Sequence, residues 1–248
     1  MRSFGIASFA IVTLFPIVGV APKIARANDA GLLRNGISAQ TPNDRFAVAT
    51  LGGYDSVRAR AVFQSRFDVR MRFNLTLMGA VALTADGAEA SVQPRIGLRL
   101  QLLSQSRDAF DLALGGGYRR DRFREDEGMV ETFVAFGRRS GSLTLLANLS
   151  AGVDLEGDDR KGSVALTLAR DFGRSAQLGI ALNAETDLAS TDARRAARGD
   201  SIYEGFAGAI GTCTVGQWAL LIEAGPSVIK TDRLRSGLVS LGGAATVF

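Results

Sequence analysis

The stretch 91-SVQPRIGLRLQLLSQ-105 alternates between two kinds of side chain. Counting by twos from Val92 gives apolar residues as far as Leu102, whereas the residues between them include Arg95 and Arg99. A period of two is typical of a β-strand, because successive side chains point to opposite faces. The stretch therefore predicts a strand with one face suited to an apolar medium and another that carries guanidinium groups.

The same alternation recurs along most of the chain. In 143-LTLLANLSAGVDL-155 and 176-AQLGIALNAETDL-188, aliphatic side chains again alternate with polar or small ones. Turn-forming breaks divide the chain into twelve expected strands at 45–53, 57–70, 74–84, 90–103, 110–121, 130–138, 143–155, 163–171, 176–188, 202–213, 218–230 and 237–248. The first strand alternates poorly. The sequence predicts an all-β fold, a closed up-and-down antiparallel transmembrane β-barrel of about 12 strands, in one domain over residues 45–248.

The first 27 residues have the layout of a secretory signal peptide. Arg2 gives a positive start, residues 4–20 form an apolar run, and residues 25–27 form a small-x-small cleavage pattern. An uncleaved membrane anchor is the alternative for this run. No later run approaches the roughly 20 apolar residues of a spanning helix. We expect export, cleavage after residue 27 and a polar lead-in over residues 28–44.

The connections between the expected strands form two alternating sets. Short connections lie at 71–74, 104–109, 139–142, 171–176 and 214–217, and longer, more charged ones at 122–129, 156–162, 189–201 and 231–236. An aromatic residue lies beside or in each short connection, namely Phe73, Phe110, Phe136, Phe172 and Trp218. Aromatic side chains are enriched at the interface between membrane and water, where part of the ring contacts lipid and part contacts water. This asymmetry favours a barrel that spans a membrane.

An export signal, about twelve alternating strands, unequal connections and a terminal Phe248 resemble a Gram-negative outer-membrane β-barrel. The resemblance covers residues 45–248 and implies an outer-membrane location, with lipid around the barrel. It also implies that the outer-membrane assembly machinery reads the C-terminal strand ending at Phe248. The positions that share the face of Phe248 carry small residues instead of the usual large apolar ones. An even strand count is usual for such barrels, which favours keeping the first strand.

Composition argues against several kinds of chemistry. The chain has no histidine, so the usual base for a serine or cysteine nucleophile and the usual zinc ligand are missing. One cysteine, Cys213, cannot form an internal disulfide. The net charge is +4, but the basic residues are spread along the strands, which argues against nucleic acid. We expect no enzyme activity, no metal and no cofactor.

Two acidic groups are weaker candidates for a site. Glu185 and Asp187 lie two apart on one strand face, where they would share a proton, bind a cation or simply line a solvated wall. The loop 154-DLEGDDR-160 offers carboxylates but lacks the spacing of a twelve-residue calcium loop. We interpret both groups as polar surface.

Charged residues on the polar strand faces are the candidate functional residues. In a membrane these faces enclose the lumen, because an arginine toward midplane lipid costs roughly 2–4 kcal/mol. The expected pore-lining residues are Arg58, Arg60, Arg66, Arg70, Arg95, Arg99, Arg119, Asp154, Glu185, Asp187 and Glu223. The arginines come from early strands and the acids from later ones, so a ring of twelve strands would set a positive wall opposite a negative one. Local pairing of Arg95 and Arg99 with Asp68 and Asp111 is the alternative.

These expectations lead to three hypotheses for function. The first is a narrow passive pore for small polar solutes. The second is a structural barrel whose lumen is plugged by its own salt bridges. The third is a soluble periplasmic binding barrel with its apolar faces inward, because periodicity does not say which face points outward.

Overall fold

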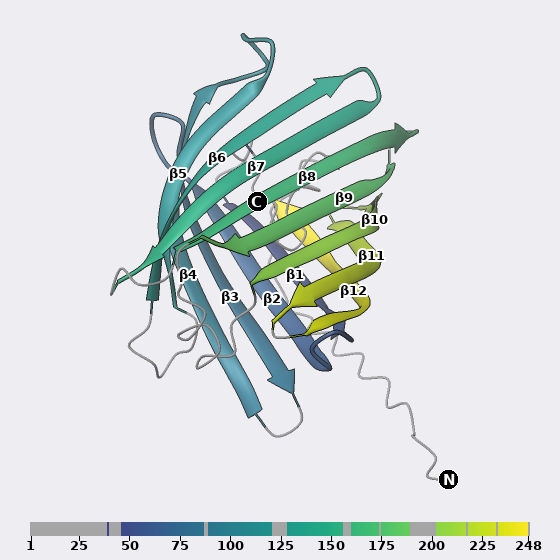
Figure 1. Ribbon diagram of the computed structural model, residues 1–248. Helices are drawn as coiled ribbons and strands as arrows, with labels where there is room; N and C mark the ends of the chain where they lie inside the picture. The colour runs from purple at the N-terminus through teal and green to yellow at the C-terminus, as the bar shows by residue number, and fades with distance from the viewer. Residues whose placement is uncertain are drawn as a thin grey trace.

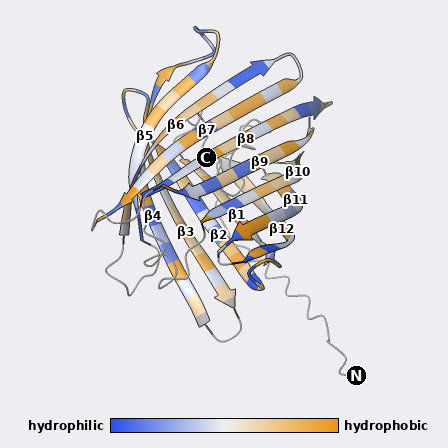
Figure 2. Ribbon diagram, in the orientation of Figure 1, coloured by the Kyte–Doolittle hydropathy of each residue, from blue (hydrophilic) through white to orange (hydrophobic). Residues whose placement is uncertain are grey.

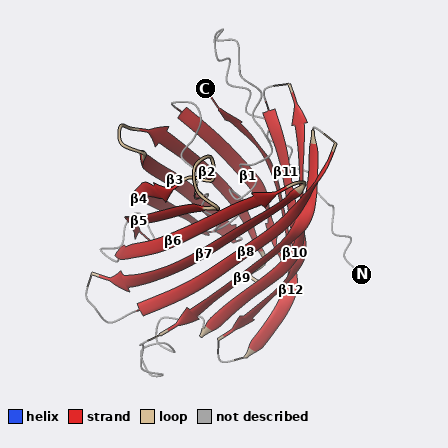
Figure 3. Ribbon diagram, turned by 90° about the horizontal axis from the view of Figure 1, so that it is seen from above, coloured by secondary structure: helices blue, strands red, loops and turns tan. Residues whose placement is uncertain are grey.

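Twelve antiparallel strands close into a barrel (Figure 1). The structure, a computed structural model, describes residues 39, 46–86, 89–120, 128–155, 160–173, 175–188, 202–216, 218–231 and 233–247. The strands are β1 (Phe46–Asp55), β2 (Arg60–Arg70), β3 (Leu75–Asp86), β4 (Glu89–Leu103), β5 (Asp111–Arg120), β6 (Gly128–Ser140), β7 (Leu143–Asp154), β8 (Arg160–Phe172), β9 (Ala176–Asp187), β10 (Tyr203–Val215), β11 (Trp218–Lys230) and β12 (Leu234–Val247). Each pairs with its neighbours in sequence, and β12 returns to pair with β1. The predicted up-and-down barrel is confirmed, and Figure 3 shows its strands arranged in a ring.

Several predicted features lie outside the described residues. These are the signal peptide over 1–27, the lead-in over 28–44 apart from residue 39, and Phe248. Signal cleavage and recognition of Phe248 by the assembly machinery therefore stay predictions. Within the described part of the chain, no helix is long and apolar enough to cross a membrane.

The apolar strand faces point outward. On β4, Leu98 and Leu100 are 47% and 41% exposed, whereas Arg99 between them is 1% exposed. Figure 2 shows the same alternation of apolar and polar residues along many of the strands. An outer surface of leucine, isoleucine and valine suits hydrocarbon, where only a closed sheet satisfies every backbone group. The soluble barrel with reversed faces is therefore wrong.

Two strands begin clearly earlier than predicted. β8 begins at Arg160 and β12 at Leu234, each three residues earlier than expected. Both strands thus take residues from the connections predicted at 156–162 and 231–236. The ladders with β7 and β11 continue to these ends, because backbone pairing does not depend on whether a side chain is apolar. Both connections are consequently shorter than predicted.

Arg58 lies in a turn, although the alternation predicted a strand from residue 57. Residues 56–59 turn the chain between β1 and β2, and Ala59 has a left-handed φ of 51°. The Asp55 carboxylate accepts hydrogen bonds from the backbone N–H groups of Val57 and Arg58, at 3.1 and 3.3 Å. Aspartate commonly stabilises turns in this way.

Large side chains enter the lumen where glycine leaves room. Phe133 on β6 points inward and is buried. A Cβ atom on Gly115, its partner on β5, would lie 2.2 Å from the Phe133 ring. Gly115 therefore makes space for an inward aromatic ring on the neighbouring strand.

Part of the lumen is apolar, contrary to the expected polar lining throughout. Inward side chains of β1, β10, β11 and β12 form buried apolar clusters that include Leu51, Ile210, Leu221, Phe206, Val239 and Leu241. The charged inward residues lie mainly on β2 and β4–β9. The lumen therefore has a charged part and an apolar part.

The positions of two adjacent residues on β9 give a test of the register. Leu182 is exposed on the outer face, and Asn183 lies on the lumen face near the ladder pair Glu185 and Glu204. Leu182→Arg is expected to destabilise folding into bilayers by about 2–4 kcal/mol, because the charge enters lipid near the midplane. Asn183→Arg is expected to fold nearly as well as the wild type, because its charge meets carboxylates. Urea titration in vesicles measures both, and an equal loss in the two variants would contradict the register.

Candidate functional site

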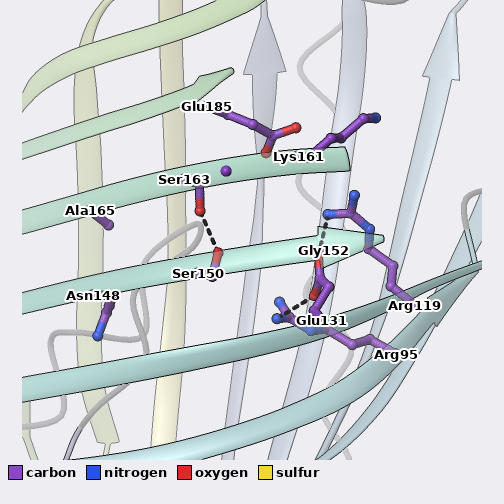
Figure 4. Close-up of a pocket in the computed structure, with 11 residues that line it drawn as sticks. Arg95, Arg119, Glu131, Asn148, Ser150, Gly152, Lys161, Ser163, Ala165 and Glu185 are labelled. Carbon is purple, nitrogen blue, oxygen red and sulfur yellow. Dashed lines mark hydrogen bonds and ion pairs between the residues drawn. The ribbon is translucent and has the colours of Figure 1, made fainter. Parts of the chain in front are cut away.

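A small polar cavity lies inside the barrel, between lumen-facing residues of β4–β9 (Figure 4). Its lining consists of Arg95, Arg119, Glu131, Asn148, Ser150, Gly152, Lys161, Gly162, Ser163, Ala165 and Glu185. The free space is about 30 Å³, which holds one or two water molecules. Three of these residues were predicted from sequence, namely Arg95, Arg119 and Glu185.

Glu131 is the centre of the charged part of this lining. Its Oε2 lies 2.6 Å from Arg95 Nη2, and its Oε1 lies 3.2 Å from Arg119 Nη1. Arg95 and Arg119 are direct partners in the β4–β5 ladder, an arrangement that like charges disfavour. Figure 4 shows both guanidinium groups converging on the Glu131 carboxylate. The carboxylate therefore offsets a repulsion that the strand register imposes.

Glu131 is absent from the residues predicted as pore-lining. It alternates with Phe133 and Ala135 on one face of β6, opposite the β-branched Val130, Thr132 and Val134. Phe133 places a large apolar side chain on the same face as Glu131, although that face points inward. The signal that would have found Glu131 is the alternation itself: Glu131 lies on the strand face opposite the three β-branched residues, which face outward.

Hydroxyl and amide groups complete the lining on β7 and β8. Ser150 Oγ and Ser163 Oγ lie 2.6 Å apart and share a hydrogen bond. Lys161 and Glu185 lie further along this wall, and Figure 4 shows their side chains on adjacent strands. The cavity thus combines three cationic side chains, two carboxylates and several neutral hydrogen-bonding groups.

Arg99 belongs to a separate buried network. Its Nη1 lies 3.4 Å from Asp68 Oδ2, and Arg66 Nε lies 3.1 Å from Asp68 Oδ1. The alternative of local pairing is confirmed for Arg99 with Asp68. Arg95 pairs with Glu131 instead of Asp68 or Asp111, so the expected partner was wrong there.

The β1–β2 turn makes an ion-pair cluster at one mouth of the barrel. Arg58 Nη1 lies 3.1 Å from Asp55 Oδ2, and its other terminal nitrogen pairs with Glu204 on β10. Arg60 Nε lies 3.8 Å from the same Asp55 oxygen. Burial lowers the pKa of the Arg58 guanidinium, but Glu204 and Asp55 outweigh this and raise it overall. Because β1 and β10 are three positions apart in the ring, this contact narrows the mouth.

The remaining predicted residues are distributed along the lumen face. Arg70 is exposed at the end of β2, Asp154 and Asp187 are half-buried at the ends of β7 and β9, and Glu223 on β11 is buried. The predicted basic residues lie on β2, β4 and β5 or the β1–β2 turn, and the predicted acids on β7, β9 and β11. Asp68 on β2 interrupts the basic wall and Lys161 on β8 interrupts the acidic one, so neither wall carries a single sign of charge.

Two weaker candidates remain, the cysteine and the acidic loop at 154–160, whose residues 156–159 lie outside the described part of the chain. Cys213 is exposed on the outer face of β10. Across the described ranges, no three His, Cys, Asp or Glu side chains are placed to hold a metal ion.

Comparison with known proteins gives relatives by fold. No family model matches the chain, and no curated protein matches it. The NanC porin superposes with a TM-score of 0.57 at 11% identity, over 81% of this chain and 99% of that chain. The KdgM porin in complex with disordered oligogalacturonate gives 0.55 at 8% identity, over 82% and 99%. LpxR from Salmonella typhimurium gives 0.54 at 10% identity, over 82% and 100%.

This chain has the fold of an outer-membrane β-barrel. At these identities the likeness concerns the fold. The apolar outer face of this outer-membrane barrel fits the same location.

The Glu131 cluster in this outer-membrane barrel gives a prediction for stability. Glu131→Gln leaves Arg95 and Arg119 facing each other without a carboxylate between them. We expect a loss of about 2 kcal/mol in the free energy of unfolding, less than for fully buried pairs because both arginines are partly exposed. Urea titration in vesicles measures the loss.

The matched control adds Arg119→Gln to Glu131→Gln. This double variant removes the repulsion together with the carboxylate and is expected to recover part of the lost stability. A Glu131→Gln variant as stable as the wild type would show that the two ion pairs contribute nothing.

Proposed function

We propose that the protein is a narrow passive pore for small polar solutes, with the polar cavity as its selective point. The observation that carries this proposal is the cavity itself, where charged and hydrogen-bonding side chains from six strands meet around a water-sized space. The NanC and KdgM porins share the fold, which supports a channel role. The predicted pore-lining residues keep that role as part of this proposal.

The cavity selects by charge and by hydrogen bonding. A polar solute that enters replaces its water with the hydroxyls of Ser150 and Ser163 and the amide of Asn148. An apolar solute offers no such exchange and leaves buried polar groups unsatisfied, which costs free energy. Low-dielectric walls focus the field of the charged groups. The pore therefore favours polar over apolar solutes of similar size.

The mixture of charges indicates the class of solute. Arg95, Arg119 and Lys161 attract anionic groups, whereas Glu185 attracts cationic ones. The solved KdgM complex contains oligogalacturonate, so a barrel of this fold accommodates a polar, acidic ligand. With both signs present around a space of about 30 Å³, a small dipolar or zwitterionic solute suits the present chain better than a long polyanion.

A structural barrel plugged by its own salt bridges is the second candidate. The ion pairs of Glu131 with Arg95 and Arg119, and of Arg58 with Glu204, favour it because they occupy the lumen and one mouth. Conductance separates the two candidates. We also infer that the protein is not an enzyme, because the sequence has no histidine to act as a catalytic base.

Ion selectivity tests the proposed pore. Lys161→Glu changes the charge of the cavity lining by two and is expected to shift selectivity toward cations. The shift is expected to be larger at low salt, because the screening length grows from about 10 Å at 0.1 M to about 30 Å at 0.01 M. The reversal potential across a planar bilayer under a KCl gradient measures it. Lys161→Gln is the graded control and should give about half the shift.

The outcomes separate the candidates. A wild-type protein that inserts without conducting supports the plugged structural barrel. A conducting wild type whose selectivity is unchanged by Lys161→Glu would show that the cavity is not on the path.

A further inference from the structure

Strands β8, β9, β10 and β11 lie side by side in the barrel wall (Figure 1), and an apolar groove crosses their outer face. The free space of the groove is about 450 Å³, within the size range of pockets that bind small molecules. Its outward-facing lining includes Val164, Leu166, Leu182, Gly205, Ala207 and Val228. These residues belong to the strand faces that point toward hydrocarbon, so the groove opens toward lipid and not toward the lumen.

Small residues form the floor of this groove. In one row across the sheet, Val164 pairs with Ala184 and Ala184 pairs with Gly205. Gly205 pairs in turn with Val228. A Cβ atom on Gly205 would have Val228 Cγ2, at 3.2 Å, as its one neighbour within 4 Å. The two valines therefore stand on either side of two small residues, and the missing side-chain volume between them is open space.

The groove suits the acyl chain of a lipid, because hydrocarbon is the medium on this face of the barrel. From β8 to β11 it extends about 14 Å at the usual spacing of strands, a shape that matches a long and narrow ligand. Lipid tails are as apolar as the groove itself, so a bound chain gains van der Waals contacts but little hydrophobic free energy. Selection of one kind of lipid therefore has to come from its headgroup.

The outer face beside the groove carries positive charge. Lys230 ends β11 two residues after Val228, about 7 Å along the strand. Tyr203 on β10 is the ladder partner of Lys230 and is exposed. Along the described outer faces of β8–β12, the charged side chains are Arg160 and Lys230 at this mouth and Arg170 near the opposite one. All three are cationic, which favours an anionic headgroup at this mouth.

We propose that the groove binds one acyl chain of an anionic lipid, whose phosphate-bearing headgroup contacts Lys230 and Tyr203. Arg160, farther round the same mouth, adds to the positive potential that attracts the headgroup. The site is separate from the polar cavity, because the two lie on opposite faces of the barrel wall. The proposal therefore does not depend on whether the lumen conducts.

Native mass spectrometry of the barrel in detergent tests the groove. Titration with phosphatidylglycerol is expected to show one tightly bound lipid per chain. Ala207→Leu fills the groove and is expected to weaken this binding at least tenfold. Ala209→Leu places the same side chain two residues along the outer face of β10, outside the groove, and should bind like the wild type. Equal binding by the two variants would overturn the groove as the site.

The headgroup is tested with phosphatidylcholine that carries the same acyl chains. Wild-type protein is expected to bind phosphatidylglycerol at least fivefold more tightly than this zwitterionic lipid, and Lys230→Gln is expected to remove the difference. Arg170→Gln removes a cation near the opposite mouth and should leave the difference intact. Migration on unheated gels confirms that each variant is folded.

Two outcomes contradict the proposal. Equal binding of the two lipids by the wild type would overturn recognition of the anionic headgroup. A dimer mass that Ala207→Leu abolishes would show that a second copy of the chain, and not a lipid, occupies the groove.

Discussion

Every backbone N–H and C=O in the spanning strands has to find its partner within the protein, because hydrocarbon offers none. The ladder between β1 and β12 meets this requirement by removing the last two free edges of the sheet. Closure then divides the side chains of each strand between lipid and lumen. Leu98 and Arg99 illustrate this division, because Leu98 is about half exposed on the outer face while the adjacent Arg99 is fully buried inside.

The same division concentrates the polar groups in a narrow interior, where they largely satisfy one another. Glu131 forms ion pairs with two arginines that the strand register places opposite each other. Asp68 forms ion pairs with Arg66 and Arg99. On the β10–β12 and β1 side, leucine, isoleucine and phenylalanine fill the lumen instead. The interior thus combines a hydrated, charged part with a packed apolar part, and the cavity lies in the charged part.

The sequence predicted the fold because its signal is local: a period of two identifies each strand and its two faces from a few residues. It also placed Arg95, Arg119 and Glu185 on the lumen face. The ion-pair partners on other strands were harder to predict. Arg95 lies beside Glu131 only because of the registers of the β4–β5 and β5–β6 ladders, which the local alternation does not specify. Strand ends at Arg160 and Leu234 depend on backbone pairing that side chains do not encode.

The ladder that closes the barrel also has consequences for the order of assembly. All other ladders join strands adjacent in the chain, and Ser140 pairs with Leu143 only three residues later. Leu51, in contrast, pairs with Gly243, 192 residues away. Hairpins form without long-range search, whereas this one contact has to wait for the last strand and carries the greatest loop-closure entropy. Closure of the barrel is therefore expected to be the slow step of folding. It depends on the β1–β12 ladder, where the paired Gly52 and Gly242 contribute little side-chain contact.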